Sequence, residues 1–421
     1  MAYPHAVAAP QLADANHDAL IIIGDDFSSL ADASLSQAIS AQQAVDARIG
    51  KQVTLLVIDS KRVILAPTGP LNRDYDDVRR YFDAAKQGVL EAKASGSTQP
   101  AILLANVNQD SRYKHALEVA YLGACQALWQ PLEAREYHGQ AIEPIGQISL
   151  VGADEAMSKA LNAIAAGQYA ARDLCGTEPE RMAPPRFADY CVELFAGSKV
   201  SVEVISDINT IDKDYPMMST VARASYAVER HHPRVVKLEY VPEGDVERTL
   251  MFVGKGLVYD TGGADLKVGG FMAGMSRDKG GAASVAGFMK SVADFAPKGV
   301  KVIAYLAVVR NSIGSDCFVP DEIITCREGV RVRIGNTDAE GRLAMGDLLS
   351  EMKDRALNEV NPELFTVATL TGHAARAMGP YSAYVENGPA RAANVSRQIA
   401  DLGDLWADGA EVSRSRREDY D

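Results

Sequence analysis

The sequence predicts an α/β protein with two domains, and three observations support this fold class. Short apolar runs alternate with longer segments of helical periodicity, which is the usual pattern of α/β domains. The chain has 421 residues, more than one ordinary hydrophobic core accommodates. Polar clusters directly follow several apolar runs, where open α/β sheets place their ligands. We therefore expect an N-terminal α/β domain and a C-terminal α/β domain with a mixed central sheet.

The first domain is expected over residues 1–170. Residues 77–94 and 113–132 have helical periodicity, and residues 154–174 predict a long helix that leads into the second domain. The apolar runs that predict strands are residues 20–23, 53–58, 62–65, 101–105 and 147–151. This alternation predicts an α/β domain that ends within the long helix.

The second domain is expected over residues 171–421. Its central sheet is predicted to be mostly parallel or mixed, and a helix is expected over residues 343–352. The predicted strands are residues 200–205, 235–241, 248–253, 301–309, 330–334 and 364–369. Two groups of charged residues lie at or just after the ends of these strands, which is the position expected for a functional site.

The first charged group is the octapeptide Asn-Thr-Asp-Ala-Glu-Gly-Arg-Leu at residues 336–343. Asp338, Glu340 and Arg342 alternate with other residues, so on extended backbone their side chains would point the same way. Two carboxylates that close repel each other unless a cation lies between them. Taken alone, this pattern is more typical of a solvated turn, because charged residues mostly lie on the surface.

The second charged group lies upstream, between residues 253 and 283. It contains Lys255, Asp260, Lys267 and Asp278, and glycines flank the first two of these residues. Glycine lets backbone approach closely or adopt a positive φ. A single lysine of this kind is usually a surface residue with a partly buried stem. Several such residues in glycine-rich settings at strand ends instead indicate a charged functional site.

Both groups resemble the motifs of the leucyl aminopeptidase (cytosol aminopeptidase) family. The family signature Asn-Thr-Asp-Ala-Glu-Gly-Arg-Leu is matched at all eight positions of residues 336–343. The upstream group resembles the family pattern Val-Gly-Lys-Gly-x-x-x-Asp-x-Gly-Gly, followed by Leu-Lys and Met-x-x-Asp, at the same spacings. Weaker similarity extends from Arg172 to Tyr420. Residues 309–316 and 326–332 resemble a variant branch of the family.

The resemblance implies a role for each matched position. Lys267 would polarise the substrate carbonyl, and Arg342 would hold a bicarbonate that acts as general base. Asn336 would support the loop rather than bind metal. The implied metal ligands are Lys255, Asp260, Asp278, Asp338 and Glu340, and the implied lining of the substrate cleft is Met275, Thr369, Leu370 and Gly372.

The chemistry of these side chains agrees with a two-metal site. Oxygen-rich ligation suits hard or borderline cations, so we expect Zn²⁺, Mn²⁺ or both, with Mg²⁺ or Co²⁺ as alternatives. Four carboxylates neutralise two divalent cations, and Lys255 would ligate only as a neutral amine. One metal could also take the α-amine of the substrate. The expected function is therefore the release of N-terminal amino acids from peptides that have a free N-terminus.

The resemblance also implies a macro-like N-terminal domain and a homo-hexamer built as a dimer of trimers. Family members continue into a segment that completes the catalytic domain, so we expect the C-terminal end of this domain to be incomplete at Asp421. The five cysteines are scattered without metal-binding spacing and predict reduced thiols. We expect a cytoplasmic protein, because residues 1–5 lack the start of a secretory signal and no apolar stretch reaches membrane-spanning length.

Two other classes of function are weighed against the enzyme. A catalytically weak or inactive paralogue could use the same fold as a scaffold, but such a protein has no reason to retain buried like charges. A nucleic-acid binder is disfavoured because the net charge is −13 and no dense stripe of basic residues is present. The expected partners are peptide substrates, with neither nucleic acid nor membrane.

Overall fold

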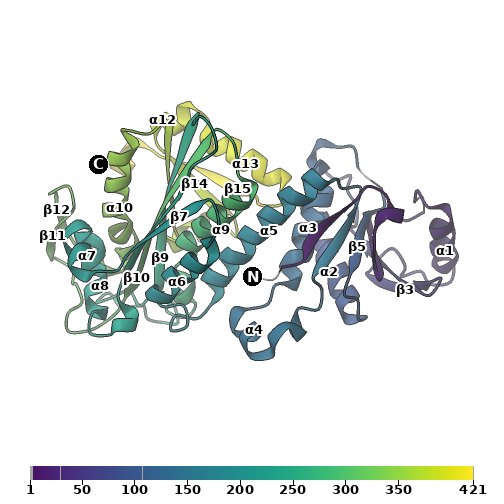
Figure 1. The fold of residues 1–421 in the computed structure, drawn as a ribbon, viewed down its shortest axis with the longest axis horizontal. Helices are drawn as coiled ribbons and strands as arrows, with labels where there is room; N and C mark the ends of the chain where they lie inside the picture. Colours follow the sequence, from purple (N-terminus) through teal and green to yellow (C-terminus); the bar gives the residue numbers. More distant parts are fainter. Residues whose placement is uncertain (1–2, 29, 107, 421) are drawn as a thin grey trace. The chain divides into compact units, whose positions relative to one another are not determined.

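The computed structural model describes residues 3–28, 30–106 and 108–420 (Figure 1). Its residues form two compact units. The first comprises residues 131–137 and 163–370, and the second comprises residues 2–130, 138–162 and 371–421. Each unit is built around its own sheet, and the predicted α/β class with a mixed central sheet in the C-terminal domain is confirmed. The predicted domain boundary near residue 170 stays a prediction.

A five-stranded mixed sheet forms the centre of the first unit, in the order β13-β9-β10-β8-β7. Strands β13, β9 and β10 are parallel, whereas β8 is antiparallel to both β10 and β7. The strands are β7 (Val200–Ile205), β8 (Arg234–Tyr240), β9 (Arg248–Asp260), β10 (Val300–Asn311) and β13 (Pro362–Val367). Parallel strands bury both faces, so their sequences are nearly continuous apolar runs.

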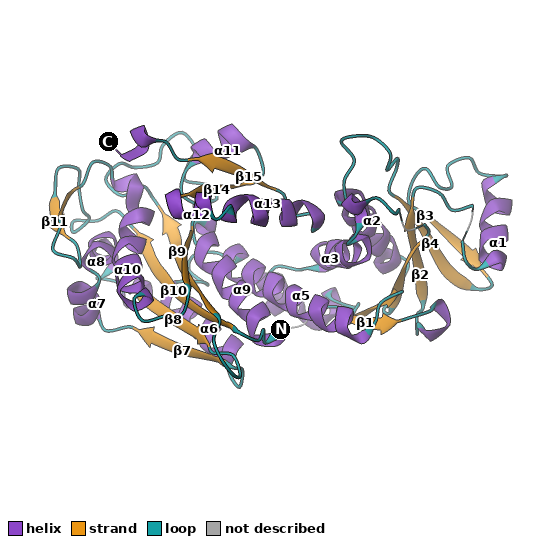
Figure 2. Cartoon of the chain, turned by 90° about the horizontal axis from the view of Figure 1, so that it is seen from above, coloured by secondary structure: helices purple, strands orange, loops and turns teal. Residues whose placement is uncertain are grey.

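Helices cover both faces of this sheet (Figure 2). Strand β10 shows why both faces are buried: alternate side chains from Val302 to Val308 pack into one core with α6 and α9, and those from Ile303 to Val309 pack into another with α8 and α10. The helices of this unit are α4 (Leu132–His138), the second part of α5 (Glu155–Gly176), α6 (Pro184–Phe195), α7 (Ile208–Asp214), α8 (Pro216–Ala222), α9 (Gly280–Phe295) and α10 (Glu340–Ala356).

Glycine in α9 allows close packing against β13. A Cβ added at Gly281 would lie 2.1 Å from the carbonyl oxygen of Val367. No side chain fits in that space, so the small residues that begin α9 bring the helix N-terminus directly onto the strand. This packing places the residues just before α9 beside the ends of β9 and β13.

One predicted strand does not join the central sheet. Residues 330–334 contain β12 (Arg331–Arg333), which pairs with β11 (Ile323–Thr325) in a separate two-stranded antiparallel sheet. The prediction is therefore wrong for this segment. Its residues alternate between exposed and partly exposed, as is typical of a surface hairpin rather than a buried parallel strand.

The second unit contains a six-stranded sheet in the order β1-β6-β5-β2-β4-β3, in which only β3 runs antiparallel to its neighbour. Its strands are β1 (His5–Ala9), β2 (Ala19–Gly24), β3 (Thr54–Ile58), β4 (Lys61–Pro67), β5 (Pro100–Leu104) and β6 (Gln147–Val151), and its helices include α1 (Ala33–Gln43), α2 (Arg79–Ala94) and α3 (Ala116–Leu128). The strands that the apolar runs of the N-terminal half predicted are therefore confirmed.

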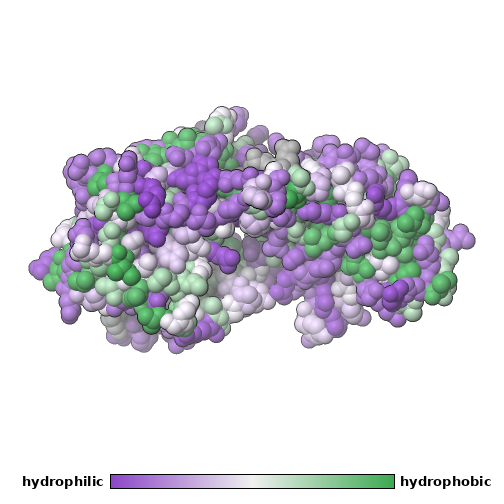
Figure 3. Space-filling view, turned by 90° about the horizontal axis from the view of Figure 1, so that it is seen from below, coloured by the Kyte–Doolittle hydropathy of each residue, from purple (hydrophilic) through white to green (hydrophobic). Residues whose placement is uncertain are grey.

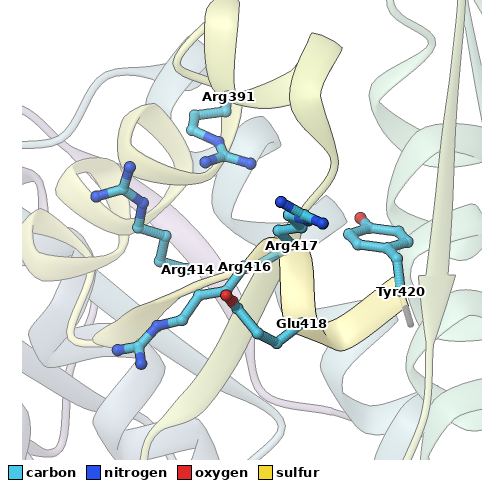
Figure 4. A pocket seen from close by; sticks show the side chains of 7 residues that line it. Arg391, Arg414, Arg416, Arg417, Glu418 and Tyr420 are labelled. Carbon is cyan, nitrogen blue, oxygen red and sulfur yellow. The ribbon is translucent and has the colours of Figure 1, made fainter.

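The last fifty residues belong to the second unit and form a small substructure. Parallel strands β14 (Ser382–Glu386) and β15 (Ala410–Arg414) are accompanied by α11 (Gly372–Met378), α12 (Gly388–Ala392) and α13 (Val395–Leu405). A cavity of about 630 Å³ lies here, and we call it the arginine cavity. Figure 4 shows its side chains; the lining residues are Arg391, Arg414, Ser415, Arg416, Arg417, Glu418 and Tyr420.

The surface is mixed in character, and the face drawn in Figure 3 is mostly hydrophilic with smaller hydrophobic areas between. Among the described residues, none of the helices combines the length and the hydropathy needed to cross a bilayer. The five cysteines form no disulfide within the described part of the chain, and Cys125 and Cys191 are buried.

Candidate metal centre

Six charged side chains of the first unit meet at the carboxyl end of β9, and we call them the carboxylate–lysine cluster. They come from β9, from the loop that follows it, from the short segment before α9, from the 3-10 turn Thr337–Ala339 and from the start of α10. The members are Lys255, Asp260, Lys267, Asp278, Asp338 and Glu340. The sequence predicted all six, and the structure brings them together.

Lys255 forms one half of the cluster with two buried carboxylates. Its Nζ lies 2.9 Å from Asp278 Oδ2 and 2.9 Å from Glu340 Oε1, and it donates a 2.8 Å hydrogen bond to the carbonyl oxygen of Thr369. The lysine stem fits because α10 has a glycine beside it: a Cβ added at Gly341 would lie 2.5 Å from Lys255 Cε. The glycine of the octapeptide therefore makes room for the buried lysine.

Lys267 forms the other half of the cluster. Its Nζ lies 2.9 Å from Asp260 Oδ2 and is also paired with Asp338 Oδ1. The loop that carries it begins with Gly262 and Gly263, whose φ angles of 86° and 66° favour glycine. These two residues turn the chain sharply after β9, so that Lys267 folds back over the carboxylate at the end of the strand.

Burial and neighbouring charges shift the pKa values of these groups in opposite directions. Burial is the largest influence on the carboxyls and raises the pKa of Asp278 to about 6 and that of Glu340 to about 7, despite the nearby charge of Lys255. Burial alone would lower the pKa values of Lys255 and Lys267, but their carboxylate partners outweigh it and raise both. Both lysines are therefore ammonium ions in this arrangement.

The cluster has an excess of negative charge, because four carboxylates face two ammonium groups. Asp260, Asp278 and Glu340 each place one oxygen within 4.8 Å of the others, and all three residues are buried. Glu340 Oε2 is buried and has no hydrogen-bond partner within the described residues. Buried carboxylates without enough positive charge are costly, so these residues fit a site for hard or borderline divalent cations.

The octapeptide reaches the cluster by a different backbone from the one expected. Thr337–Ala339 is a single 3-10 turn, and Glu340 begins α10. The expectation of extended backbone is therefore wrong, and the change of direction between turn and helix is what brings both carboxylates to the site. Arg342 is exposed on α10, and no hydrogen bond or ion pair joins it to the cluster within the described residues.

The residues predicted to line a substrate cleft have different positions. Thr369 follows β13, and its Oγ1 donates a 2.7 Å hydrogen bond to Asp278 Oδ1. Leu370 comes next and is half exposed, and Met275 lies in the 3-10 turn three residues before Asp278. Gly372 begins α11, in the second unit.

Asn311 is a buried polar residue at the site that the sequence motifs did not predict. It ends β10, directly opposite Asp260 in the register of the sheet, and its Nδ2 donates a 2.8 Å hydrogen bond to Asp260 Oδ1. Asn336 caps the turn of the octapeptide by accepting a hydrogen bond from the backbone N–H of Asp338, as a supporting residue would. A polar residue that ends a long apolar run was the signal for Asn311.

The fold and the cluster agree with comparisons to known proteins. Residues 169–408, more than half of the chain, match the model of the cytosol aminopeptidase family, catalytic domain. The class defined in this way is that of the aminopeptidases, which are hydrolases. The chain belongs to the cytosol aminopeptidase family, as the predicted resemblance indicated.

A relative from Caenorhabditis elegans, which carries the provisional name of an aminopeptidase, is 41% identical over 428 residues, covering 98% of this chain and 81% of the relative. Two solved structures share the fold. Tomato leucine aminopeptidase has a TM-score of 0.81 at 20% identity and covers 99% of this chain and 83% of its own. A bottromycin maturation enzyme in complex with manganese has a TM-score of 0.79 at 21% identity, and the match covers 96% of this chain and 83% of that enzyme.

Proposed function

We propose that the chain releases N-terminal amino acids from peptides at a site that holds two divalent cations. The observation that carries the proposal is the buried excess of carboxylates over ammonium groups in the carboxylate–lysine cluster. Asp260, Asp278, Asp338 and Glu340 would supply oxygen ligands, and Lys255 would ligate after losing its proton to solvent. The manganese named for the structural neighbour supports Mn²⁺ as one candidate, with Zn²⁺, Mg²⁺ and Co²⁺ as the others.

Divalent cations bound at this site would supply the Lewis acidity that activates water for attack on a peptide carbonyl. The chain's own residues would orient the substrate and stabilise the charge that develops. Lys267 remains charged and would donate to the developing oxyanion. Met275, Thr369 and Leu370 would line the cleft beside Asp278, while the contribution of Gly372 stays a prediction.

Arg342 is proposed to hold a bicarbonate that acts as general base. Its guanidinium group is exposed and is not paired with a carboxylate within the described residues. A planar guanidinium is suited to binding a small planar anion through two parallel hydrogen bonds.

Assembly into a hexamer as a dimer of trimers is part of the same proposal, and light scattering of the purified chain would test it. Cytoplasmic localisation stays a prediction.

Hydrolysis of leucine p-nitroanilide in the presence of Mn²⁺ or Zn²⁺ tests the proposed activity. Glu340→Gln keeps the size of the side chain but removes a ligand charge, and we expect turnover to fall by at least about 100-fold. Asp294→Asn is the matched control, because Asp294 pairs with Lys290 on the surface of α9, away from the cluster. Undiminished turnover of the Glu340 variant would contradict the proposal.

The alternative proposal, an inactive scaffold, predicts a different result for the unaltered chain. Such a protein would contain no divalent cation after purification and would show no hydrolysis on addition of Mn²⁺. Metal analysis together with the same assay therefore separates the two functions. The buried excess of carboxylates favours the enzyme, because a scaffold gains nothing from unbalanced buried charge.

A further inference from the structure

Asn311 joins two metal-ligand segments that are distant in the sequence. The residue is fully buried, and its Nδ2 donates to Asp260 Oδ1 at 2.8 Å and to the carbonyl oxygen of Thr337 at 3.1 Å. Thr337 directly precedes Asp338 in the octapeptide. One side-chain amide thus connects the carboxylate at the end of β9 with the turn that carries Asp338 and leads into α10.

The orientation of this amide is determined by its neighbours. Both contacts are to acceptors, a carboxylate oxygen and a backbone carbonyl, so only the NH₂ group can face them. Reversing the amide would place Oδ1 against two other oxygens. The backbone of Asn311 is held as well, because its carbonyl oxygen accepts hydrogen bonds from the N–H and the Oγ1 of Thr261 at 3.1 and 3.0 Å.

Thr337 provides a second connection between the same segments. It is fully buried, and its Oγ1 donates to the carbonyl oxygen of Gly262 at 2.6 Å and accepts from the N–H of Asp265 at 2.8 Å. Its own N–H donates to Asp265 Oδ2 at 2.7 Å. Hydrogen bonds from both the side chain and the backbone of Thr337 therefore hold the loop that carries Lys267 against the turn that carries Asp338.

The space around these two residues admits no larger neighbour. A Cβ added at Gly263 would lie 3.0 Å from Thr337 Oγ1 and 3.1 Å from Asn311 Oδ1. The close fit means that Asn311 and Thr337 can shift little without moving the loop. Small displacements of a ligand carboxylate are enough to weaken a metal site, because ligand distances are tightly defined.

We propose that Asn311 is a positioning residue that, together with Thr337, sets the relative placement of Asp260 and Asp338 for metal binding. This inference rests on the proposed function, since it assigns residues that support its metal site. An amide is required at position 311 because a carboxylate there would face Asp260 and a backbone carbonyl without any donor. A hydroxyl is required at position 337 because it both donates and accepts.

Two pairs of variants test the proposal through metal affinity, which a general loss of stability does not by itself change. Asn311→Asp keeps the shape and removes both donors, and we expect the affinity for Mn²⁺, measured by calorimetry, to fall by roughly 10- to 100-fold. Asn162→Asp is its control: Asn162 donates at 3.0 Å to the backbone carbonyl of Ala6 in the second unit, so Mn²⁺ affinity should be unchanged.

Thr337→Val and Thr337→Ser form the second pair, and they keep the test decisive if the Asn311 variant fails to fold. The valine variant removes the hydroxyl at nearly constant volume and should bind Mn²⁺ roughly 10-fold or more weakly, whereas the serine variant should restore near-normal affinity. Turnover number is expected to fall more than KM rises.

The outcomes distinguish this inference from the proposed function. Normal Mn²⁺ affinity in both Asn311→Asp and Thr337→Val would overturn the positioning role while leaving the enzyme intact. An unaltered chain that binds no divalent cation would overturn the proposed function and the positioning role together. If Thr337→Ser weakened Mn²⁺ binding as much as Thr337→Val, this result would also contradict the role of the hydroxyl.

Discussion

The carboxylate–lysine cluster and the arginine cavity both gather charged side chains, but they differ in burial and in pairing. In the cluster, each lysine lies between two carboxylates, and four of the six residues are buried. In the arginine cavity, four exposed arginines share a small space, and none is paired with a carboxylate among the residues that the structure describes.

The difference follows from the solvent around each group. Two like charges a few ångströms apart interact weakly in water but strongly in a medium of low permittivity. Exposed arginines are therefore tolerated side by side, whereas buried carboxylates need counter-ions. The consequence is that changes of charge in the cluster should have large effects on stability and changes in the cavity should have small ones.

The largest expected effect is that of Lys255→Met in metal-free protein at pH 8. Removal of this ammonium leaves Asp278 and Glu340 as buried carboxylates without their counter-ion, which typically costs about 3–5 kcal/mol. Urea unfolding in the presence of a chelator measures the change. Lys290→Met breaks a surface pair with Asp294 and should cost no more than about 1 kcal/mol. Equal losses in both variants would remove the contrast between buried and exposed charge.

The second prediction concerns pH. Because the pKa of Glu340 is raised to about 7 in the folded chain, the folded state binds a proton that the unfolded state releases near pH 4.5. The stability of the metal-free protein should therefore fall as pH rises from about 4.5 to 7. Glu340→Gln should flatten this dependence. A stability that rises across the same window in the unaltered chain would show that Glu340 is ionised at lower pH.

A smaller effect is expected when a glycine is replaced in each region. Gly341→Ala places a Cβ against the stem of Lys255 and should cost about 1–3 kcal/mol. Gly388→Ala, at the start of α12, places a Cβ where no atom lies within 4 Å and should be neutral or slightly stabilising. Thermal unfolding of the two variants compares them directly. Similar losses of stability in the two variants would mean that the space beside the Lys255 stem can accommodate a Cβ at position 341.

The smallest effect is expected in the arginine cavity. Arg414→Gln removes one of four like charges at an exposed position, so the free energy of unfolding should change by no more than about 0.5 kcal/mol. Any gain should be larger at low salt, where repulsion between the arginines is less screened. Urea unfolding at two ionic strengths measures it. A loss above about 1 kcal/mol would indicate that Arg414 has a stabilising partner.

Most strands could be predicted because buried strands have local signatures in the sequence. The apolar run of residues 301–309 predicted β10, and the run of residues 20–23 predicted β2. Residues 330–334 alternate apolar residues with arginine, which predicts a strand but not which sheet it joins, and they form part of a surface hairpin. The candidate site residues were predicted from two family motifs, and these motifs lie in two separate segments of the chain.

The sequence by itself determined which charged residues form the carboxylate–lysine cluster and which class of protein contains it, because the two motifs retain the family's residue types and spacings. Only the tertiary structure decided how they meet. The octapeptide turns into a helix instead of staying extended, Arg342 remains exposed, and Asn311 at the end of a different strand holds Asp260. Contacts between residues far apart in the chain depend on sheet register, which local sequence patterns do not contain.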